Sequence, residues 1–381
     1  MHPLRDKTAV VGVGASPQGK IPDATALSLA VEAFKRALDD SGLRKEQIDG
    51  LLTMPGSTSP EAALNYLRFG ETVGINPRYT GSKVMGGGTA GALLHEAALA
   101  VNAGFANHVA CVFGDAAATG GSRFSRASGW GDSFAIWGFM AACANSAITA
   151  ARHMALYGTT SRQLGEIAVA CRYHASLNPN AVMRKPITIE DHQNSRWIVK
   201  PLHLLDCCLI SDGGVCVIVT TAERARDCKK PLVLISGMGQ AYTTENMERE
   251  DWWYVPHQKL ALADAYKMAA VGPKDIDVAQ LYDNFTSSVL VWFEHGGFCK
   301  VGESGPFVEG GRIRLGGELP INTAGGNLSE SYMEGWLHIV EGARQVRGEC
   351  GERQVKGAEV CLVTGRGQAL NCANATILRK G

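Results

Sequence analysis

The segment NTAGGNLSESYMEG (Asn322–Gly335) places two adjacent glycines before a polar stretch that leads into the apolar-patterned run beginning at Trp336. Adjacent glycines let the backbone take conformations that are closed to residues with a Cβ atom. A shorter segment, MGGGTAG (Met85–Gly91), opens another helix in the first half of the chain. Because a glycine loop at a helix N-terminus gathers free N–H groups, the two segments are candidate parts of one site.

The elements around these two segments follow one another in the same order, which predicts a duplicated α/β fold. The expected elements of the first half are the strand Thr8–Val13, the helix Leu27–Leu38, the helix Ala92–Asn102 and the strand His108–Gly114. Those of the second half are the strand Leu232–Ser236, the helix His257–Ala269, the helix Glu334–Arg347 and the strand Glu359–Gly365. A repeat of such a long period indicates two related halves packed together.

The repeat also predicts the domain boundaries. The first half is expected to span residues 1–225 and the second residues 232–381, joined by the linker Arg226–Pro231. Residues from about 116 to 206 interrupt the repeat in the first half. Insertions in a βα scaffold usually form lids or substrate walls, so this stretch is expected to be a loop domain beside the site.

The composition limits which partners we expect the protein to bind and where in the cell we expect it to lie. The 381 residues include 37 Lys and Arg and 37 Asp and Glu, which gives a net charge of +0. Because proteins that bind nucleic acids or anionic membranes need a surplus of basic residues, this balance argues against either kind of binding. No apolar run approaches the roughly 20 residues that span a bilayer, and the N-terminal MHPLRDKT lacks the apolar core of a signal peptide. A cytoplasmic protein is therefore expected. The 11 cysteines form no C-x-x-C pair, so no metal site is expected.

Four motifs then carry a family likeness. They are LNPNA (Leu177–Ala181), TIED (Thr188–Asp191), PLHLLDCC (Pro201–Cys208) and SDGG (Ser211–Gly214). Together with the duplicated halves, they resemble the thiolase superfamily, specifically the thiolase domain related to sterol carrier protein-x. The resemblance implies a five-layered αβαβα thiolase fold and a homodimer built edge to edge on the first-half sheets.

The residues at the catalytic positions of that family are different here. Thiolases keep a nucleophilic cysteine in the loop that corresponds to Met85–Gly91, where this chain has Gly86, Gly87 and Gly88. Without a thiol at this position there is no acyl-enzyme. The motif before Phe285 is Tyr282-Asp283-Asn284, and Tyr332 corresponds to a thiolase histidine. Only the late cysteine of the family has a loose counterpart, Cys361.

These departures resemble one branch of the superfamily, the steroid side-chain retro-aldolases. That resemblance implies cleavage of a β-hydroxyacyl-CoA, such as a 17-hydroxy C22 steroid thioester, to a ketone and a shorter acyl-CoA. The CoA moiety would belong to the substrate, and no separate cofactor is implied. The branch works with a small OB-fold zinc-ribbon partner, often attached to a hydratase. An aromatic or branched acyl chain would need only different pocket walls.

Retro-aldol cleavage needs a base for the β-hydroxyl proton and a site that stabilises the thioester enolate. The resemblance makes Tyr282 and Tyr332 the acid/base pair, activated either by a pKa lowered by helix dipoles or by a proton relay. Asp283 is expected to orient one tyrosine, or alternatively to cap a local turn. Backbone N–H groups are expected to bind the thioester oxygen at Gly86, Gly87, Gly88, Gly326, Gly365 and Gly367. Further residues that could line the site are Asn284, His295, Cys299 and Cys361.

Three alternatives stay open at this point. A tyrosine at the end of a strand is more often a packing residue with a satisfied hydroxyl. The chain could instead be an acyl-CoA acyltransferase that has relocated its nucleophile, in which case the enzyme would become acylated. It could also be a non-catalytic subunit that binds an acyl-CoA or a lipid, which would show binding without turnover.

Overall fold

The computed structural model describes residues 2–59, 64–121, 141–243, 257–367 and 372–381. Its strands are β1 (Thr8–Ala15), β2 (Gly50–Met54), β3 (Tyr79–Ser82), β4 (His108–Ala116), β5 (Trp197–Val199), β6 (Leu202–His203), β7 (Asp212–Thr221), β8 (Val233–Tyr242), β9 (Val278–Gln280), β10 (Val360–Gly367) and β11 (Cys372–Lys380). Its helices are α1 (Ala26–Ser41), α2 (Asn65–Val73), α3 (Thr89–Asn102), α5 (Ala141–Tyr157), α6 (Ser161–Ser176), α7 (Ile189–Asn194), α8 (Ala222–Ala225), α9 (His257–Ala269), α10 (Thr286–His295), α11 (Ser304–Phe307), α12 (Gly326–Ser329) and α13 (Trp336–Arg347). No helix in these ranges is long and apolar enough to cross a membrane.

The strand order confirms the duplication. Nine strands form one sheet in the order β3-β2-β4-β7-β1-β8-β11-β10-β9. Outward from β1, the first half runs β1-β7-β4-β2-β3, with the first two pairings antiparallel and the next two parallel. Outward from β8, the second half runs β8-β11-β10-β9 with the same directions, and a parallel bridge from Ala279 to Ile321 takes the place of the last pairing.

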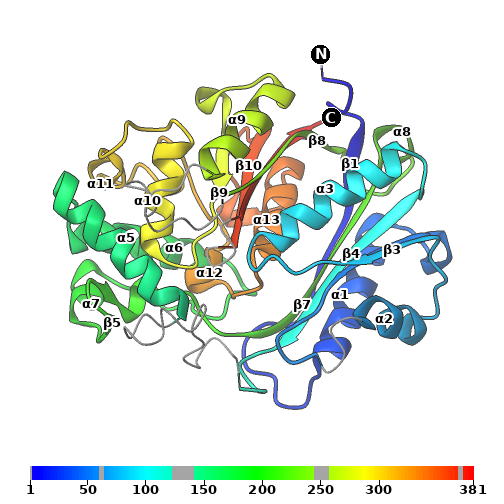
Figure 1. Cartoon of the computed structure of the whole chain (residues 1–381), viewed down its shortest axis with the longest axis horizontal. Coiled ribbons are helices and arrows are strands. Elements are labelled where there is room, and N and C mark those ends of the chain that lie inside the picture. Colours follow the sequence, from blue (N-terminus) through cyan, green and yellow to red (C-terminus); the bar gives the residue numbers. More distant parts are fainter. Residues whose placement is uncertain (1, 60–63, 122–140, 244–256, 368–371) are drawn as a thin grey trace.

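The two halves meet where β1 and β8 pair in antiparallel register. The helices α3 and α13 lie next to each other in the middle of the molecule (Figure 1), and each contacts strands of both halves. On the outer faces, α1 covers β7 and β1, while α9 covers β8 and β11. With each half of the nine-stranded sheet counted as one layer, the layers are helix, sheet, helices, sheet, helix, which confirms the expected five-layered thiolase-type architecture.

Alternation along the strands explains why both faces of each half are buried. Neighbouring residues of a strand point to opposite faces. In β1, Val10 belongs to the central core around α3 and α13, whereas Ala9 and Val11 belong to the outer core beneath α1. A β-bulge between Val10 and Gly12 then shifts the alternation, so Val13 also faces the central core. Strands covered on both faces appear in sequence as continuous apolar runs, which is why the core strands were predictable.

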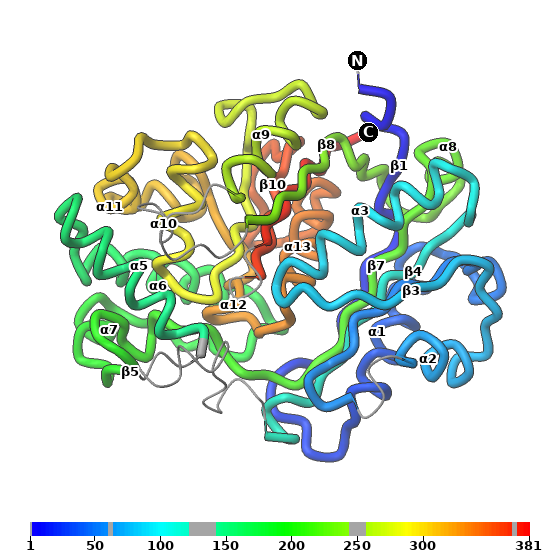
Figure 2. The backbone as a smooth tube through the Cα atoms, viewed as in Figure 1, coloured from blue at the N-terminus to red at the C-terminus, as the bar shows by residue number. Residues whose placement is uncertain are grey.

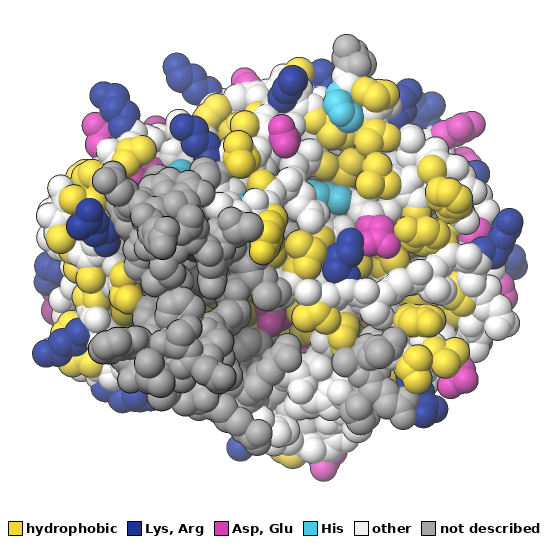
Figure 3. Space-filling view, in the orientation of Figure 1, with side chains coloured by type: hydrophobic (Ala, Val, Ile, Leu, Met, Phe, Trp, Pro, Cys, Tyr) yellow, Lys and Arg dark blue, Asp and Glu magenta, His cyan; other side chains and the backbone are white. Residues whose placement is uncertain are grey.

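The chain ends lie on the same side of the molecule (Figure 2). The N–H of Gly381 donates to the carbonyl of Leu232 at 3.1 Å, so the last strand is anchored beside the start of the second half. Basic and acidic side chains are interspersed on the face shown in Figure 3, in agreement with the balanced composition.

The bounds of most expected elements differ from those in the structure, and two of these differences have a clear physical cause. The last central helix begins at Trp336 and not at Glu334, because Glu334 and Gly335 have left-handed φ values of 49° and 84°. The strand expected to end at Ser236 continues to Tyr242, because β11 pairs with it along this whole length. Part of the expected loop domain, residues 122–140, lies outside the described residues. The domain boundaries stay a prediction.

Candidate active site

Tyr282 and Tyr332, which are 50 residues apart in sequence, lie together in the structure. Their hydroxyl oxygens are 3.0 Å apart, a hydrogen-bonding distance. Tyr282 follows β9 and is only 1% exposed, and its N–H donates to Oγ1 of Thr364 on β10. Tyr332 lies in the segment between α12 and α13 and is partly buried. The structure thus brings together the two tyrosines that were predicted from the sequence to act as a pair.

Glu334 extends this pair into a chain of three side chains, and the sequence did not single it out. The Tyr332 hydroxyl donates to Oε2 of Glu334 at 3.1 Å. A phenol carries one proton, so Tyr332 can only accept at its contact with Tyr282, which must be the donor there. The order of donation is therefore Tyr282 to Tyr332 to Glu334. Glu334 is 5% exposed and has a φ of 49°, an uncommon conformation for a residue with a side chain.

Both phenols are held neutral. Burial raises the pKa of Tyr282 well above its ordinary value, and the nearby charge of Glu334 raises it further. Burial and Glu334 raise the pKa of Tyr332 in the same way. The expectation of a pKa lowered by helix dipoles is therefore wrong, because desolvation and a neighbouring carboxylate both disfavour the tyrosinate. The second expectation, a proton relay, fits the observed chain.

Gly87 provides the space that Tyr282 fills. A Cβ atom on Gly87 would overlap the ring and hydroxyl of Tyr282. On Gly335, whose φ of 84° already favours glycine, a Cβ atom would lie 3.2 Å from the same ring. The tyrosine thus occupies the room that a side chain on the glycine loop would need.

The other glycines of the expected oxyanion site let the loop approach β10. A Cβ on Gly365 would lie 2.8 Å from the carbonyl oxygen of Gly87, and one on Gly367 would lie 2.7 Å from Sγ of Cys372. The N–H of Gly88 donates to the carbonyl of Met85 at 3.1 Å, so this amide is used within the turn. Gly86 has a φ of 53°, which favours glycine. Binding of a thioester oxygen by the amides of Gly86, Gly87, Gly326, Gly365 and Gly367 stays a prediction.

Asp283 holds the start of α12 and does not bind a tyrosine hydroxyl. Its Oδ1 accepts from the N–H of Asn327 at 2.8 Å and lies 3.0 Å from Nε2 of His338. Within the described residues it forms no hydrogen bond to either phenol, so the expected direct orientation is wrong. A Cβ on Gly326 would overlap Oδ2 of Asp283, so this glycine makes room for the carboxylate. The ring of His338, which sequence reasoning missed, lies 6.1 Å from that of Tyr282.

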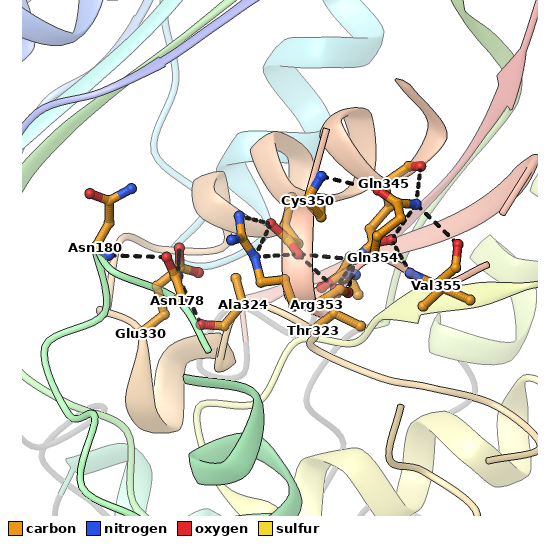
Figure 4. Close-up of polar contacts among 12 residues, drawn as sticks. Asn178, Asn180, Thr323, Ala324, Glu330, Gln345, Cys350, Arg353, Gln354 and Val355 are labelled. Carbon is orange, nitrogen blue, oxygen red and sulfur yellow. Dashed lines mark hydrogen bonds and ion pairs between the residues drawn. The ribbon is translucent and has the colours of Figure 1, made fainter. Parts of the chain in front are cut away.

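The LNPNA motif forms hydrogen bonds to the segment that carries Tyr332. Nδ2 of Asn178 donates to the carbonyl of Ala324 at 3.0 Å and to Oε1 of Glu330 at 3.2 Å (Figure 4). The N–H of Val182 donates to the carbonyl of Glu330. Burial, followed by the charge of Glu341, raises the pKa of Glu330 to about 8. Hydrogen bonds from Asn178 and Val182 therefore hold the Tyr332 segment in place.

A second set of contacts, also drawn in Figure 4, anchors the beginning of this segment. Thr323 Oγ1 donates to Oε1 of Glu341 at 2.8 Å, and both carboxylate oxygens of Glu341 receive bonds from Arg353. Gln345 donates to Thr323 Oγ1 at 2.9 Å. These buried partners hold the backbone between β9 and α13 in one arrangement.

Three of the further residues that could line the site have other surroundings in the structure. Cys361 is buried in β10 against α13, and burial raises its thiol pKa, so it is a core residue and not part of the site. Asn284 Oδ1 accepts from Ser288 in the first turn of α10, and its carbonyl accepts from the N–H of Cys208. Cys299 packs beyond α10, where burial raises its pKa to about 12.

His295 and three cysteines lie closer to the candidate site. His295 ends α10, and its pKa is lowered to about 3 by burial and by the charge of Arg366. Cys372 donates to the carbonyl of Met85 in the glycine loop, and Cys171 lies 3.9 Å from Asp283. The charge of a Cys208 thiolate would raise the pKa of both tyrosines, which places Cys208 near them. Sequence reasoning did not identify these three thiols.

Comparison with known proteins identifies the family to which this fold belongs. The family description "Thiolase C-terminal domain-like" matches residues 239–380. A 17-hydroxy-3-oxo-4-pregnene-20-carboxyl-CoA lyase of Mycobacterium tuberculosis is 40% identical over 381 residues, covering 95% of this chain and 96% of the relative. A steroid side-chain-cleaving aldolase of Thermomonospora curvata is 37% identical over 384 residues, covering 96% and 97%. The solved structure "Ltp2-ChsH2(DUF35) aldolase" superposes with a TM-score of 0.90 at 37% identity, covering 99% of this chain and 98% of that one.

The duplicated αβαβα architecture and its glycine-lined tyrosine site define a thiolase-fold protein without the thiolase nucleophile. The chain belongs to the thiolase superfamily, in the branch related to the sterol-carrier-protein thiolases.

Proposed function

We propose that this protein is a CoA-thioester retro-aldolase, a carbon–carbon lyase that cleaves a β-hydroxyacyl-CoA to a ketone and a shorter acyl-CoA. The observation that carries the proposal is the Tyr282–Tyr332–Glu334 hydrogen-bond chain opposite Gly87. A base relay without a nucleophile suits bond cleavage by proton transfer. The named activities of two full-length relatives support a steroid side chain as the acyl group.

The relay accounts for every proton of the reaction. The substrate β-hydroxyl donates to Tyr282, Tyr282 passes its proton to Tyr332, and Tyr332 passes its own to Glu334. The hydroxyl oxygen becomes the ketone as the Cα–Cβ bond breaks, and the electron pair of that bond moves into the thioester as an enolate. Return of the proton to the α-carbon yields the shorter acyl-CoA. Both tyrosines stay neutral before and after the transfer, so their raised pKa values do not oppose it.

The thiols near the site argue against acyl transfer by a relocated cysteine. Burial is the largest cause that raises the pKa of Cys171, Cys208 and Cys372. The thiolate is the nucleophilic form of cysteine, and a thiol with a raised pKa is a poor nucleophile at neutral pH.

The assembly belongs to the same proposal. The protein acts as a cytoplasmic homodimer joined to a small DUF35 protein with an OB fold and a zinc ribbon, itself fused to or associated with a hydratase. The superposed aldolase structure carries a DUF35 component in its name, which supports this assembly. The acyl-CoA is the substrate, and no separate cofactor takes part. The strand β3 at the end of the sheet offers the edge for the homodimer.

A substrate panel tests the proposal. The chain is co-produced with a DUF35 partner and incubated with β-hydroxyacyl-CoA thioesters that carry steroid, aromatic and branched acyl chains. We expect release of the matching ketone, fastest with the steroid. Binding of all the thioesters without ketone release would support a non-catalytic subunit and contradict the proposal.

A further inference from the structure

His338 of α13 contacts both residues that flank Tyr282 in the sequence. Its Nε2 lies 3.0 Å from the carbonyl oxygen of Leu281 and 3.0 Å from Oδ1 of Asp283. A carbonyl oxygen only accepts hydrogen bonds, so Nε2 carries the proton and donates it between the two oxygens. Nδ1 is buried and has no hydrogen-bond partner among the described residues. In that part of the chain, the hydrogen bonds of the His338 side chain therefore all go to the turn that carries Tyr282.

These contacts are shielded from water. His338 is 2% exposed, and Leu281 and Asp283 are fully buried. In the low dielectric of such a site a hydrogen bond is electrostatically stronger than in water. The N–H of Tyr282 is also held, because it donates to Oγ1 of Thr364 at 2.9 Å. The main chain on both sides of the tyrosine is thus fixed in one arrangement.

His338 also joins the two segments that form the hydrogen-bond chain. Tyr282 follows β9, whereas Tyr332 and Glu334 lie in the segment that leads into α13. His338 lies in the first turn of α13, so its hydrogen bonds connect the start of this helix to the Tyr282 turn. The centre of its ring is 6.1 Å from that of the Tyr282 ring. The histidine is therefore a direct link between the parts of the chain that supply the two tyrosines.

We infer that His338 is a positioning residue that keeps the Tyr282 hydroxyl in hydrogen-bonding distance of the Tyr332 hydroxyl during proton transfer. This inference rests on the proposed function, because the distance between the hydroxyls matters for the rate only if a proton passes along them. That distance is 3.0 Å. Acid/base catalysis works over about 2.6–3.2 Å between heavy atoms, so a small displacement of the turn breaks the contact. In the described part of the chain His338 bonds to neither hydroxyl, so it acts through the turn and not as a base.

The fold is expected to survive the loss of this histidine, because both acceptors keep other partners. The carbonyl of Leu281 also accepts from Nδ2 of Asn322 at 2.9 Å. Oδ1 of Asp283 also accepts from the N–H of Asn327 at 2.8 Å. Replacement of His338 therefore leaves neither acceptor unpaired. What it removes is the connection between α13 and the turn.

The test compares three substitutions of His338 in the chain co-produced with its DUF35 partner. Leucine removes the donor, glutamine can place an N–H near the position of Nε2, and asparagine is too short to do so. For His338→Leu and His338→Asn we expect kcat to fall by about 10²-fold, the effect typical of a displacement of about 1 Å, with KM within about threefold. His338→Gln is expected to keep most of the wild-type rate.

A solvent isotope effect separates positioning from a loss of folded protein. The kcat of each variant is measured in H2O and in D2O. A longer gap between the hydroxyls slows the proton transfer itself, so we expect a larger isotope effect in His338→Leu than in the wild type, and the wild-type value in His338→Gln. A variant that is only less stable contains fewer active molecules, and its isotope effect stays that of the wild type.

His153 provides a matched control. It is 1% exposed, and its Nε2 lies 2.9 Å from Oε1 of Glu294, a contact that joins α5 to α10. Glu294 also accepts from the N–H of Gly302 at 2.9 Å, so this buried pair of histidine and carboxylate also keeps a main-chain donor. His153→Leu is expected to lower Tm while kcat and its isotope effect stay those of the wild type.

Three results would overturn the inference. They are a kcat of His338→Leu within about threefold of the wild type, an isotope effect in it that equals the wild-type value, and equal losses in His338→Gln and His338→Asn. The last comparison also decides the matter if His338→Leu does not fold. Ketone release by the wild-type complex would still support the proposed function in each of these cases. A wild-type complex that releases no ketone contradicts the proposed function and this inference together.

Discussion

Tyr282 fills the space that a Cβ atom on Gly87 would need, and its hydroxyl lies directly against that glycine. The missing side chain and the buried phenol are therefore two parts of one arrangement. A thiolase places a nucleophile on this loop, whereas in this chain the phenol of Tyr282, which follows β9, fills the space beside the loop. A nucleophilic side chain at Gly87 and the phenol of Tyr282 cannot occupy the same volume.

This relationship predicts the effect of Gly87→Ala. The new methyl group displaces the Tyr282 ring from its bond with Tyr332, and we expect kcat to fall by about 10²-fold or more, as for loss of a general acid or base. Steady-state cleavage of a β-hydroxyacyl-CoA measures it. Gly272→Ala is the matched control, because a Cβ there meets only Asp275 Oδ2, at 3.8 Å. Equal rates in the two variants would contradict the packing argument.

Removal of either hydroxyl should interrupt the relay. For Tyr282→Phe and Tyr332→Phe we expect kcat to fall by about 10²- to 10⁴-fold with the fold intact, because the rings keep their packing. The double variant should be little worse than the worse single variant, since each change breaks the same chain. Circular dichroism confirms folding, and wild-type rates in both folded single variants would exclude the tyrosines.

Glu334 should be needed as the end of the relay. Glu334→Gln keeps the shape of the side chain but cannot take up a proton, so kcat is expected to fall by about 10²-fold while KM changes little. Glu352→Gln, an exposed acidic residue, serves as the control. A Glu334→Gln variant with the wild-type kcat would mean that the proton leaves by another route.

The raised pKa of Glu330 predicts a pH-dependent stability. Its pKa of about 8 lies above the ordinary value of 4.5, so the protonated carboxyl contributes stability that is complete below pH 4.5 and is lost as the pH rises through 8. Within this window the slope approaches about 1.4 kcal/mol per pH unit for one proton. Glu330→Gln, which stays uncharged, should flatten the dependence of the unfolding free energy on pH between 5 and 9. Urea unfolding of both proteins at several pH values measures this, and parallel curves would contradict it.

The thiols near the site should react slowly. Burial raises the pKa of Cys208 and Cys372, so iodoacetamide at pH 7 is expected to leave activity unchanged over the time in which free cysteine is alkylated. Rapid inactivation that the substrate prevents would instead indicate a reactive cysteine at the site.

Much of the fold was predictable, because its signals are local or periodic. The apolar runs of β1, β7 and β10 and the repeated order of elements depend on burial of both sheet faces, which leaves a clear trace in sequence. The bounds of α9 agree with the expected helix His257–Ala269. The late start of α13 was not predictable, because it depends on the left-handed φ of Glu334, a residue type that rarely adopts it.

Site residues could be predicted where they correspond to the catalytic positions of the thiolase family. They could not be predicted where only contacts in the folded structure bring them to the site. Tyr282 and Tyr332 fall on the catalytic positions of the superfamily, and the structure brings their hydroxyls together. Glu334 carries no local pattern that marks it, since a left-handed turn of the backbone brings it to the site. Asp283 was expected to orient one of the two tyrosines, but its carboxylate accepts the N–H of Asn327 in α12, a contact that no local sequence pattern marks.

The central claim is carbon–carbon cleavage without an acyl-enzyme, and one measurement addresses it directly. The wild-type complex is incubated with a β-hydroxyacyl-CoA in the absence of free CoA, and products and intact protein mass are followed together. The account predicts ketone and shorter acyl-CoA in equal amounts over many turnovers, with no mass added to the protein. Cleavage that stops after one turnover until free CoA is supplied, with an acyl group on the protein, would contradict it.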